Sequence, residues 1–378
     1  MNTPIQPSPP HQPSPPASPT GTRRVNLALQ GGGSHGAFTW GVLDTLLQDG
    51  RLQIDGISGA SAGAVNAVAL AHGFATASHK GGEATEPREA ARATLARIWQ
   101  GVAAMGSLGS MAESISKMML GGWSGAGSAV GVEFFSQASN AMSQWLSPYQ
   151  SNPLDINPLR QLLENEIDFA AIASHQALKV FVSATQVTTG KAEIFAGKRL
   201  TLQAVMASTC LPTVFQAVEI DGQPYWDGGF SSNPALLPLI NECTSTDIIV
   251  VQINPLRRDQ APQTPHDIMD RVNELTFNAS LLSQMRTIDF INRRLADGRL
   301  QAGSKYKNVL LHRIDGGEAL EELPASSKLS ADNAMIEKLF EMGQGAARRW
   351  LHRHFEALGQ QSTVNIRKDY IGTLGRDF

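Results

Sequence analysis

The stretch that decides the fold runs from Val25 to Gly63 and reads VNLALQGGGSHGAFTWGVLDTLLQDGRLQIDGISGASAG. It begins with an apolar run of strand length, Val25–Gln30, which three glycines stop at once. Apolar residues at helical spacing follow, and then a second strand is expected at Leu52–Ile57 and a helix at Ala62–His72. Two successive strand–turn–helix units indicate right-handed parallel crossovers, and hence an α/β sheet covered by helices.

The rest of the chain extends this sheet and adds a long helix. Further strands are expected at Lys179–Ala184, Ile248–Ile253 and Val309–Ile314. The long helix should begin with Thr264 as its N-cap and Pro265 at its first position. Its apolar stripe is interpreted as core and comprises Ile268, Val272, Leu275, Ala279, Leu282, Met285, Ile288, Ile291 and Leu295.

Composition shifts divide the chain into three regions. Residues 1–20 contain eight prolines and no apolar run, so residues 1–22 are expected to be a disordered Pro-rich tail rather than a signal peptide. Residues 23–315 form the expected main domain. Within it, the methionine-rich, charge-poor segment 101–150 is interpreted either as a helical lid-like insertion or as ordinary packing. A helix expected from Asp332 to Leu358 predicts a C-terminal helical extension, residues 316–378, packed on that domain.

Composition also excludes several classes of protein. The 378 residues are 42% hydrophobic and 17% charged, which is ordinary globular material. The formal net charge of −3 gives no field that would steer nucleic acid. The two cysteines, Cys210 and Cys243, cannot build a disulfide framework or a thiolate zinc site. Because no apolar run could span a bilayer, we expect a protein that is cytoplasmic or peripheral to the inner membrane face. The sequence leaves its oligomeric state open.

The second strand runs into a motif that is typical of a nucleophilic serine. Gly59-Ala60-Ser61-Ala62-Gly63 fits G-x-S-x-G, with an apolar strand before it and a helix after it. Small residues at Gly59 and Gly63 allow a sharp turn, and the turn places Ser61 at a helix N-terminus that can stabilise an oxyanion. The alternative interpretation is a helix start at which Ser61 acts only as the N-cap.

The first strand runs into a second glycine turn, Gly31-Gly32-Gly33-Ser34-His35-Gly36. Its backbone N–H groups can converge on one anion. The turn also fits G-x-G-x-x-G, and Asp55 follows about 20 residues later, as expected of a dinucleotide-binding fold. However, two anion-stabilising turns at one sheet edge favour acyl transfer, in which one holds the nucleophile and the other donates to the oxyanion.

A candidate base lies on a third glycine turn, Trp226-Asp227-Gly228-Gly229. Gly228 and Gly229 let the backbone pass close to another element and leave the Asp227 carboxylate free to reach a hydroxyl. An ordinary Asp-Gly hairpin turn is the alternative. No histidine outside the glycine loop has such a turn beside it, so the sequence favours Asp227 over a histidine as the partner of Ser61.

These three motifs, in this order, resemble the patatin-like phospholipase family, whose pattern is a G-G-G-x-x-G loop, a G-x-S-x-G elbow and a D-G-G or D-G-A aspartate. The resemblance extends through Asn157–Phe169 and Ala207–Pro212 and covers roughly residues 25–315. It implies a three-layer α/β/α fold with a mostly parallel central sheet, to which the composition adds the inserted helical lid and the C-terminal helical cap. It also implies a Ser61–Asp227 dyad that cleaves acyl esters of lipids without a metal or cofactor.

The resemblance further implies an oxyanion hole formed by the glycine loop, with Gly31, Gly32, Gly33, Ser34 and Gly36 as its residues. His35 stands where the family usually has Arg or Lys, which bears on support of the loop or on headgroup recognition. The expected partner is a lipid or acyl-ester substrate, with room for peripheral membrane contact and no nucleic acid. From the residues alone, a nucleotide-binding protein and a catalytically silent lipid-binding module stay open as alternatives.

Overall fold

The computed structural model describes residues 21–77, 86–121, 147–303, 306–323, 327–328 and 331–372. The Pro-rich tail predicted at residues 1–22 therefore lies almost wholly outside the described residues. The same holds for residues 122–146 of the predicted lid.

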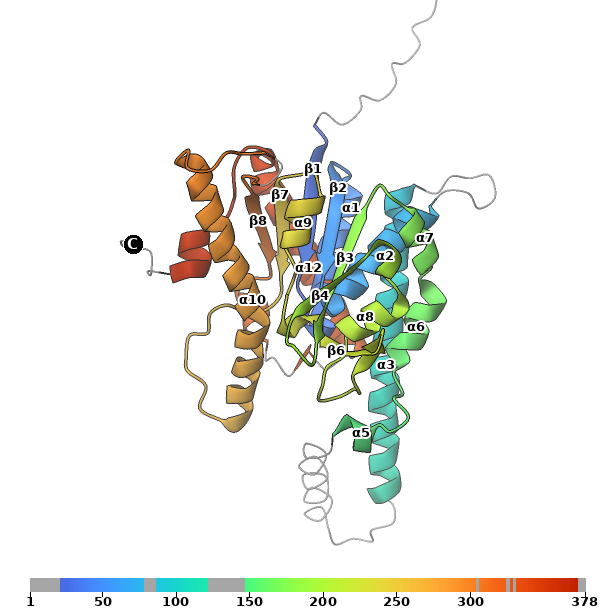
Figure 1. Cartoon of the computed structure of the whole chain (residues 1–378). Coiled ribbons are helices and arrows are strands. Elements are labelled where there is room, and N and C mark those ends of the chain that lie inside the picture. Colours follow the sequence, from blue (N-terminus) through green and yellow to red (C-terminus); the bar gives the residue numbers. More distant parts are fainter. Residues whose placement is uncertain are drawn as a thin grey trace, which may run out of the picture.

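A mixed β-sheet forms the centre of the molecule (Figure 1). Its parallel part has the order β3-β2-β1-β7-β8, with β1 (Arg23–Leu29), β2 (Leu52–Gly59), β3 (Lys179–Gln186), β7 (Asp247–Gln252) and β8 (Leu310–Asp315). The antiparallel strands are β4 (Ala192–Ala196), β5 (Val218–Ile220) and β6 (Gln223–Asp227). Both β4 and β6 pair with β3, and β5 pairs with β6. The predicted α/β class with a mostly parallel sheet is confirmed.

Helices cover both faces of the sheet. One face is covered by α1 (Gly36–Asp49), α2 (Ala62–Thr76) and α12 (Asn333–His354), and α3 (Pro87–Gly121) packs on the outside against these helices. The other packs against α9 (Leu237–Glu242) and α10 (Pro265–Ala296). The shorter helices are α5 (Pro148–Ser151), α6 (Pro158–Glu166), α7 (Phe169–Ser174), α8 (Leu202–Ser208) and α11 (Glu318–Glu321). Single helical turns occur at η1 (Gly33–His35), η2 (Gly197–Arg199), η3 (Gly228–Phe230), η5 (Phe355–Ala357) and η6 (Arg367–Ile371).

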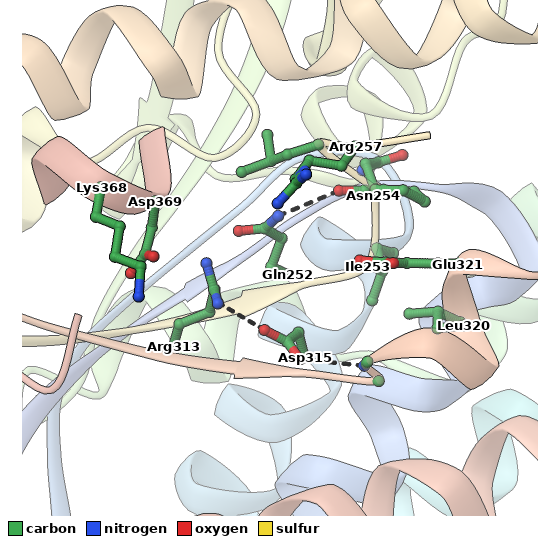
Figure 2. A pocket seen from close by; sticks show the side chains of 14 residues that line it. Gln252, Ile253, Asn254, Arg257, Arg313, Asp315, Leu320, Glu321, Lys368 and Asp369 are labelled. Atoms are coloured by element: carbon green, nitrogen blue, oxygen red, sulfur yellow. Dashed lines mark hydrogen bonds and ion pairs between the residues drawn. The ribbon is translucent and has the colours of Figure 1, made fainter. Parts of the chain in front are cut away.

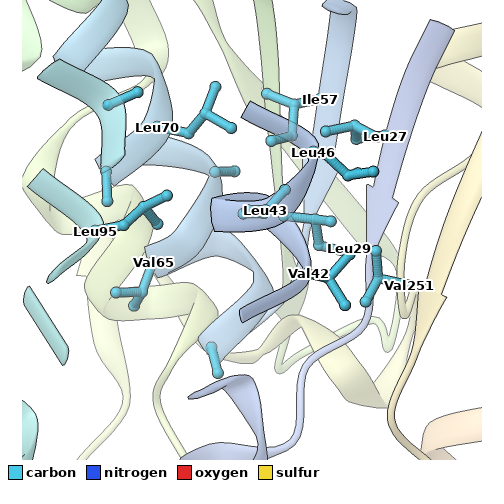
Figure 3. Packing of buried hydrophobic residues seen from close by; sticks show 14 of the residues in the cluster. Leu27, Leu29, Val42, Leu43, Leu46, Ile57, Val65, Leu70, Leu95 and Val251 are labelled. Atoms are coloured by element: carbon cyan, nitrogen blue, oxygen red, sulfur yellow. The ribbon is translucent and has the colours of Figure 1, made fainter. Parts of the chain in front are cut away.

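The core is divided between the two faces by the alternation of side chains along β1. Leu27 and Leu29 pack in the cluster that contains α1, α2 and α3 (Figure 3). Ala28, which points to the opposite face, packs in the cluster that contains Leu281 and Met285 of α10. Because both faces of the central strands are covered, these strands are mostly apolar, and the sequence shows them as apolar runs. Asn26 of β1 and Ser58 of β2 are buried polar exceptions.

The C-terminal helix predicted from Asp332 to Leu358 is confirmed as α12, and it packs closely on α1. Gly41 of α1 lies against the backbone carbonyl of Phe340, and Gly343 of α12 lies against that of Phe38. A side chain at either glycine would push the two helices apart. Residues 101–121 continue α3 without a break, so a lid role for segment 101–150 stays a prediction.

The long helix α10 corrects one expectation. In its second half, Met285 and Ile288 of the predicted stripe are buried and Leu282, Ile291 and Leu295 are half-buried. In its first half, Ile268, Val272 and Leu275 are 44%, 47% and 52% exposed. The prediction that the whole stripe is core is therefore wrong for the first half. Figure 1 shows the reason: the amino-terminal part of α10 projects past the end of the sheet, where no strand lies beneath it. In the described part of the chain, no helix is both long and apolar enough to cross a membrane.

Candidate active site

Ser61 lies on a strained turn between β2 and α2. Its backbone has φ 52° and ψ −126°, a conformation that costs a non-glycine residue about 1–3 kcal/mol and that the surrounding structure must hold in place. Gly59 and Gly63 pack against each other, and Gly63 also lies against the backbone carbonyl of Leu29 in β1. Side chains at these two positions would not fit, which explains the motif. The Ser61 N–H donates to Ser208 Oγ at 2.9 Å.

Asp227 ends β6, two strands away from the Ser61 turn. It pairs with Ala184 of β3, while Val182 of the same strand pairs with Gly59 at the end of β2. Its backbone is held on both sides, because its N–H donates to the Cys210 carbonyl at 2.8 Å and its carbonyl accepts from Thr185 Oγ1 at 2.7 Å. Strand pairing thus brings a residue far along the chain to the edge where β2 finishes.

The Asp227 carboxyl group is completely buried, and burial raises its pKa to about 7. Two hydrogen-bonding groups oppose this rise: the Gly229 N–H, which donates to Oδ1 at 2.7 Å, and the Ser61 side chain. Among the described residues, however, Oδ2 has no partner that meets the distance and angle limits of a hydrogen bond. The two side chains are therefore neighbours without a fully formed hydrogen bond between them.

The glycines after Asp227 are required by close packing. Gly228 lies against the backbone carbonyl of Ser183, and Gly229 lies against the ring of Phe277. Asp227 caps the single turn η3 and is not part of a hairpin loop. The Asp-Gly hairpin turn in this region is Asp221-Gly222, which joins β5 to β6 with φ values of 52° and 72°. The alternative interpretation of Asp227 as a hairpin residue is therefore wrong.

The glycine loop follows β1 and wraps in front of the Ser61 turn, because Gly31 lies against Ala60 and the Ser61 Cβ. Two of its five predicted oxyanion-hole residues are already engaged through their N–H groups. The Gly31 N–H donates to Asn233 Oδ1 at 2.6 Å, and the Gly36 N–H donates to the Gly33 carbonyl. Gly31 and Gly36 therefore shape the loop, and the N–H groups of Gly32, Gly33 and Ser34 are the candidate donors.

A buried polar network beneath the loop was not foreseen from the sequence. Gln30 Oε1 accepts from the N–H groups of Ile253 and Asn254 at 3.0 and 2.9 Å. Asn254 Nδ2 donates to the Gly31 carbonyl at 2.8 Å, and Asn233 Nδ2 donates to the Phe277 carbonyl. These amides are buried and fix the loop through several elements. The only sequence signal is their position directly after strands or beside the Asp227 turn.

His35 is buried, at 2% exposure, with Nε2 2.7 Å from Ser327 Oγ. Burial is the largest of the effects that lower its pKa to about 3, so the ring is neutral at physiological pH. Because the side chain is buried, it cannot contact a headgroup directly, and an effect of His35 on substrate choice stays a prediction. Its contact with Ser327 ties the loop to the C-terminal part of the chain, which agrees with a role in supporting the loop.

Two other histidines, His312 and His72, have structural partners. His312 Nε2 is 3.0 Å from Asp247 Oδ1, at the amino-terminal end of β7, which is the opposite end of the sheet from Ser61. His72 Nδ1 accepts from the Asp168 N–H at 3.0 Å. Within the described ranges, no histidine is among the groups that shift the pKa of Asp227.

Asp55, the acidic residue that dinucleotide binding would need, already accepts hydrogen bonds from within the protein. Asp55 Oδ2 accepts from the Thr244 N–H, Thr244 Oγ1 and the Ser245 N–H at 2.6, 2.7 and 2.9 Å. These bonds tie β2 to the segment before β7, within the sheet rather than at its carboxyl edge. The dinucleotide interpretation thus loses the residue that would hold the ribose.

Thiol and metal chemistry have little support in the described part of the chain. Cys210 and Cys243 are free and buried, and burial raises the pKa of their thiols to about 12 and about 11. Thiols with such pKa values are not nucleophilic at neutral pH. The described His, Cys, Asp and Glu side chains form no group of three that could hold a metal ion.

A cavity of about 300 Å³ lies at the carboxyl ends of β7 and β8 (Figure 2). Its charged side chains partly neutralise one another, with Arg313 Nε 2.6 Å from Asp315 Oδ2. The cavity shares Asn254 with the network beneath the loop. Neither Ser61 nor Asp227 is among its lining residues, so it is separate from the candidate active site.

A family model described as Patatin-like phospholipase matches residues 27–240, a range that contains the glycine loop, the Ser61 turn and Asp227. Among solved structures, the crystal structure of VipD from Legionella pneumophila is similar, with 16% sequence identity and a TM-score of 0.38. That alignment covers 93% of this chain and 73% of the other. A search of curated proteins found no match.

Proposed function

Because the chain belongs to the patatin-like phospholipase family, we propose that it hydrolyses acyl esters of lipids, with Ser61 as the nucleophile and Asp227 as the base. Family membership supports a lipid hydrolase in general. The observation that carries the finer proposal is that a strained serine and a buried aspartate lie next to each other at one sheet edge. The Ser61 side chain is close enough to oppose the rise in the pKa of Asp227 that burial causes.

In the proposed first half-reaction, the ionised Asp227 accepts the Ser61 hydroxyl proton while Ser61 Oγ attacks the ester carbonyl carbon. The carbonyl oxygen becomes an oxyanion, which the N–H groups of Gly32, Gly33 and Ser34 would bind. As the tetrahedral intermediate collapses, Asp227 returns the proton to the leaving alcohol oxygen. The acyl group stays on Ser61.

The second half-reaction repeats these steps with water. Asp227 takes a proton from a water molecule as the water oxygen attacks the acyl carbon, and the oxyanion forms again at the glycine loop. Collapse breaks the bond to Ser61 Oγ, which regains the proton from Asp227, and the fatty acid leaves. A base whose pKa is about 7 is suited to give and take a proton in turn near neutral pH.

Exposed apolar side chains support a substrate held in a lipid aggregate. Ile268, Val272 and Leu275 lie on the part of α10 that projects past the sheet, at the end where β1 and β2 finish (Figure 1). Helix α5, at the same end, carries Tyr149 with 60% exposure. We propose that this end makes peripheral contact with a membrane, so that an acyl ester can reach Ser61 from the surface.

The test is hydrolysis of p-nitrophenyl octanoate and of phosphatidylcholine in mixed micelles. We expect the wild type to cleave both, and Ser61→Ala to lose turnover by several orders of magnitude. Ser174→Ala, at an exposed serine on α7, is the matched control and should be unchanged. Equal rates for Ser61→Ala and the wild type would refute the assignment. Binding of micelles without hydrolysis would identify a silent lipid-binding module instead.

A further inference from the structure

The C-terminal extension places a short segment, Ser327–Lys328, directly on the glycine loop. Ser34 Oγ donates to the Ser327 carbonyl at 2.9 Å, and His35 Nε2 is 2.7 Å from Ser327 Oγ. The Lys328 carbonyl lies against Gly33, which has φ 57° and no room for a side chain. The loop is therefore held from outside by Lys328 and by Ser327, which lies 293 positions after Ser34 and 292 after His35.

The ammonium group of Lys328 reaches the inner side of the same loop. Lys328 Nζ donates to Asn254 Oδ1 at 2.7 Å, and Asn254 Nδ2 donates to the Gly31 carbonyl at 2.8 Å. Asn254 Oδ1 also lies 3.6 Å from the point where a Cβ on Gly32 would be. Only the Asn254 side chain thus separates the positive charge of Lys328 from the backbone of Gly31 and Gly32.

Several charged groups surround this ammonium. Burial lowers the pKa of Lys328 to about 8, and Arg258 acts in the same direction, while Glu274 and Asp270 of α10 raise it. Glu274 is itself paired with Arg258 and Arg271. His35 faces the same region but is neutral at physiological pH, because its own pKa is about 3. At pH 7, Lys328 therefore carries a charge that the loop's own histidine does not.

We propose that Lys328 is a positioning residue for acyl transfer: its carbonyl and its ammonium hold the glycine loop in place, and its positive charge favours the oxyanion that develops there. The inference rests on the proposed function. Its physical basis is that a fixed positive charge in a poorly solvated site stabilises nearby negative charge far more than it would in water. It gives the C-terminal extension, which lies outside the family match, a part in the site.

The experiment measures kcat and KM for p-nitrophenyl octanoate between about pH 6 and about pH 10. Wild-type kcat should fall above about pH 8, as Lys328 loses its proton. Lys328→Arg keeps its charge over this range, so it should retain kcat at pH 7 and lack the alkaline fall. Lys328→Met should lower kcat roughly tenfold or more with little change in KM, again without the fall.

Lys338→Met, at an exposed lysine of α12, is the matched control and should behave as the wild type. A Lys328→Met protein with wild-type kcat and an unchanged alkaline fall would overturn the inference. If the Lys328→Met protein does not fold, the Lys328→Arg protein provides the test. A fall in its kcat above about pH 8 like that of the wild type would overturn the role of the charge. A wild type that cleaves no ester, or that matches Ser61→Ala, refutes the proposed function itself, which is a different result.

Discussion

The hydroxyl of Ser208 accepts a 2.9 Å hydrogen bond from the backbone N–H of Ser61. Ser208 is the last residue of α8 and is fully buried, 147 positions away from Ser61 along the chain. The bond satisfies an N–H group at the point where the backbone has the unfavourable φ of 52°. Ser208 is thus one of the contacts that hold the candidate nucleophile in its strained conformation.

Replacing Ser208 with alanine should therefore weaken both stability and turnover. Loss of the acceptor leaves a buried N–H unsatisfied, which costs about 1–3 kcal/mol. We expect a melting temperature a few degrees lower and a kcat/KM reduced about tenfold or more, because Ser61 is no longer fixed. Thermal unfolding and ester kinetics measure the two effects, with Ser174→Ala as control. Wild-type values for both would show that the bond does not matter.

Asp227 should give the protein a characteristic dependence on pH. Its pKa is about 7 in the folded chain, whereas an unfolded aspartate ionises near pH 4. The unfolded state therefore loses this proton first, so the group destabilises the fold increasingly as pH rises from about 4 to about 7. Hydrolysis should rise over the upper part of this range, because the proposed base must be ionised.

Asp227→Asn tests this linkage. The variant should be inactive at every pH, yet at pH 8 it should be more stable than the wild type, by up to about 4 kcal/mol. The difference should shrink toward zero near pH 4. Denaturant unfolding of both proteins across this range gives the answer. A stability difference that does not change with pH would mean that Asp227 titrates normally.

The histidine variants separate a dyad from a triad. His312→Ala removes the partner of Asp247, which is buried, so we expect a loss of about 1–3 kcal/mol in stability. Turnover per folded molecule should stay near the wild-type value, since this pair lies at the other end of the sheet. His72→Ala should likewise keep its kcat. Loss of turnover in either folded variant would require a Ser-His-acid triad.

The exposed stripe on α10 can be tested for membrane contact. Changing Ile268, Val272 and Leu275 together to serine should weaken binding to phosphatidylcholine vesicles about tenfold or more, because apolar area available for burial is lost. The melting temperature should hardly change. Phe290→Ser, at a residue 50% exposed on the other half of α10, is the control. Undiminished vesicle sedimentation of the triple variant would rule out this surface.

The sequence by itself was sufficient for the features that depend on neighbouring residues. The strand before Gly31, the turn at Ser61 and the helix after it are local, because a short apolar run, a tight turn and helical spacing each lie within a few residues. The order of these units predicted the parallel sheet, since right-handed crossovers leave few alternatives. Both glycine turns then had to emerge at the carboxyl edge.

Only the tertiary structure decided which side chains support these turns and which surfaces stay uncovered. Asn233 and Asn254 bond to Gly31 and Lys328 lies against Gly33, each from more than 200 positions away, and such contacts leave no periodic trace in the sequence. The α10 stripe shows the same limit. Periodicity tells which residues share a helix face, but burial depends on whether another element covers that face, and past the end of the sheet Ile268 stays 44% exposed.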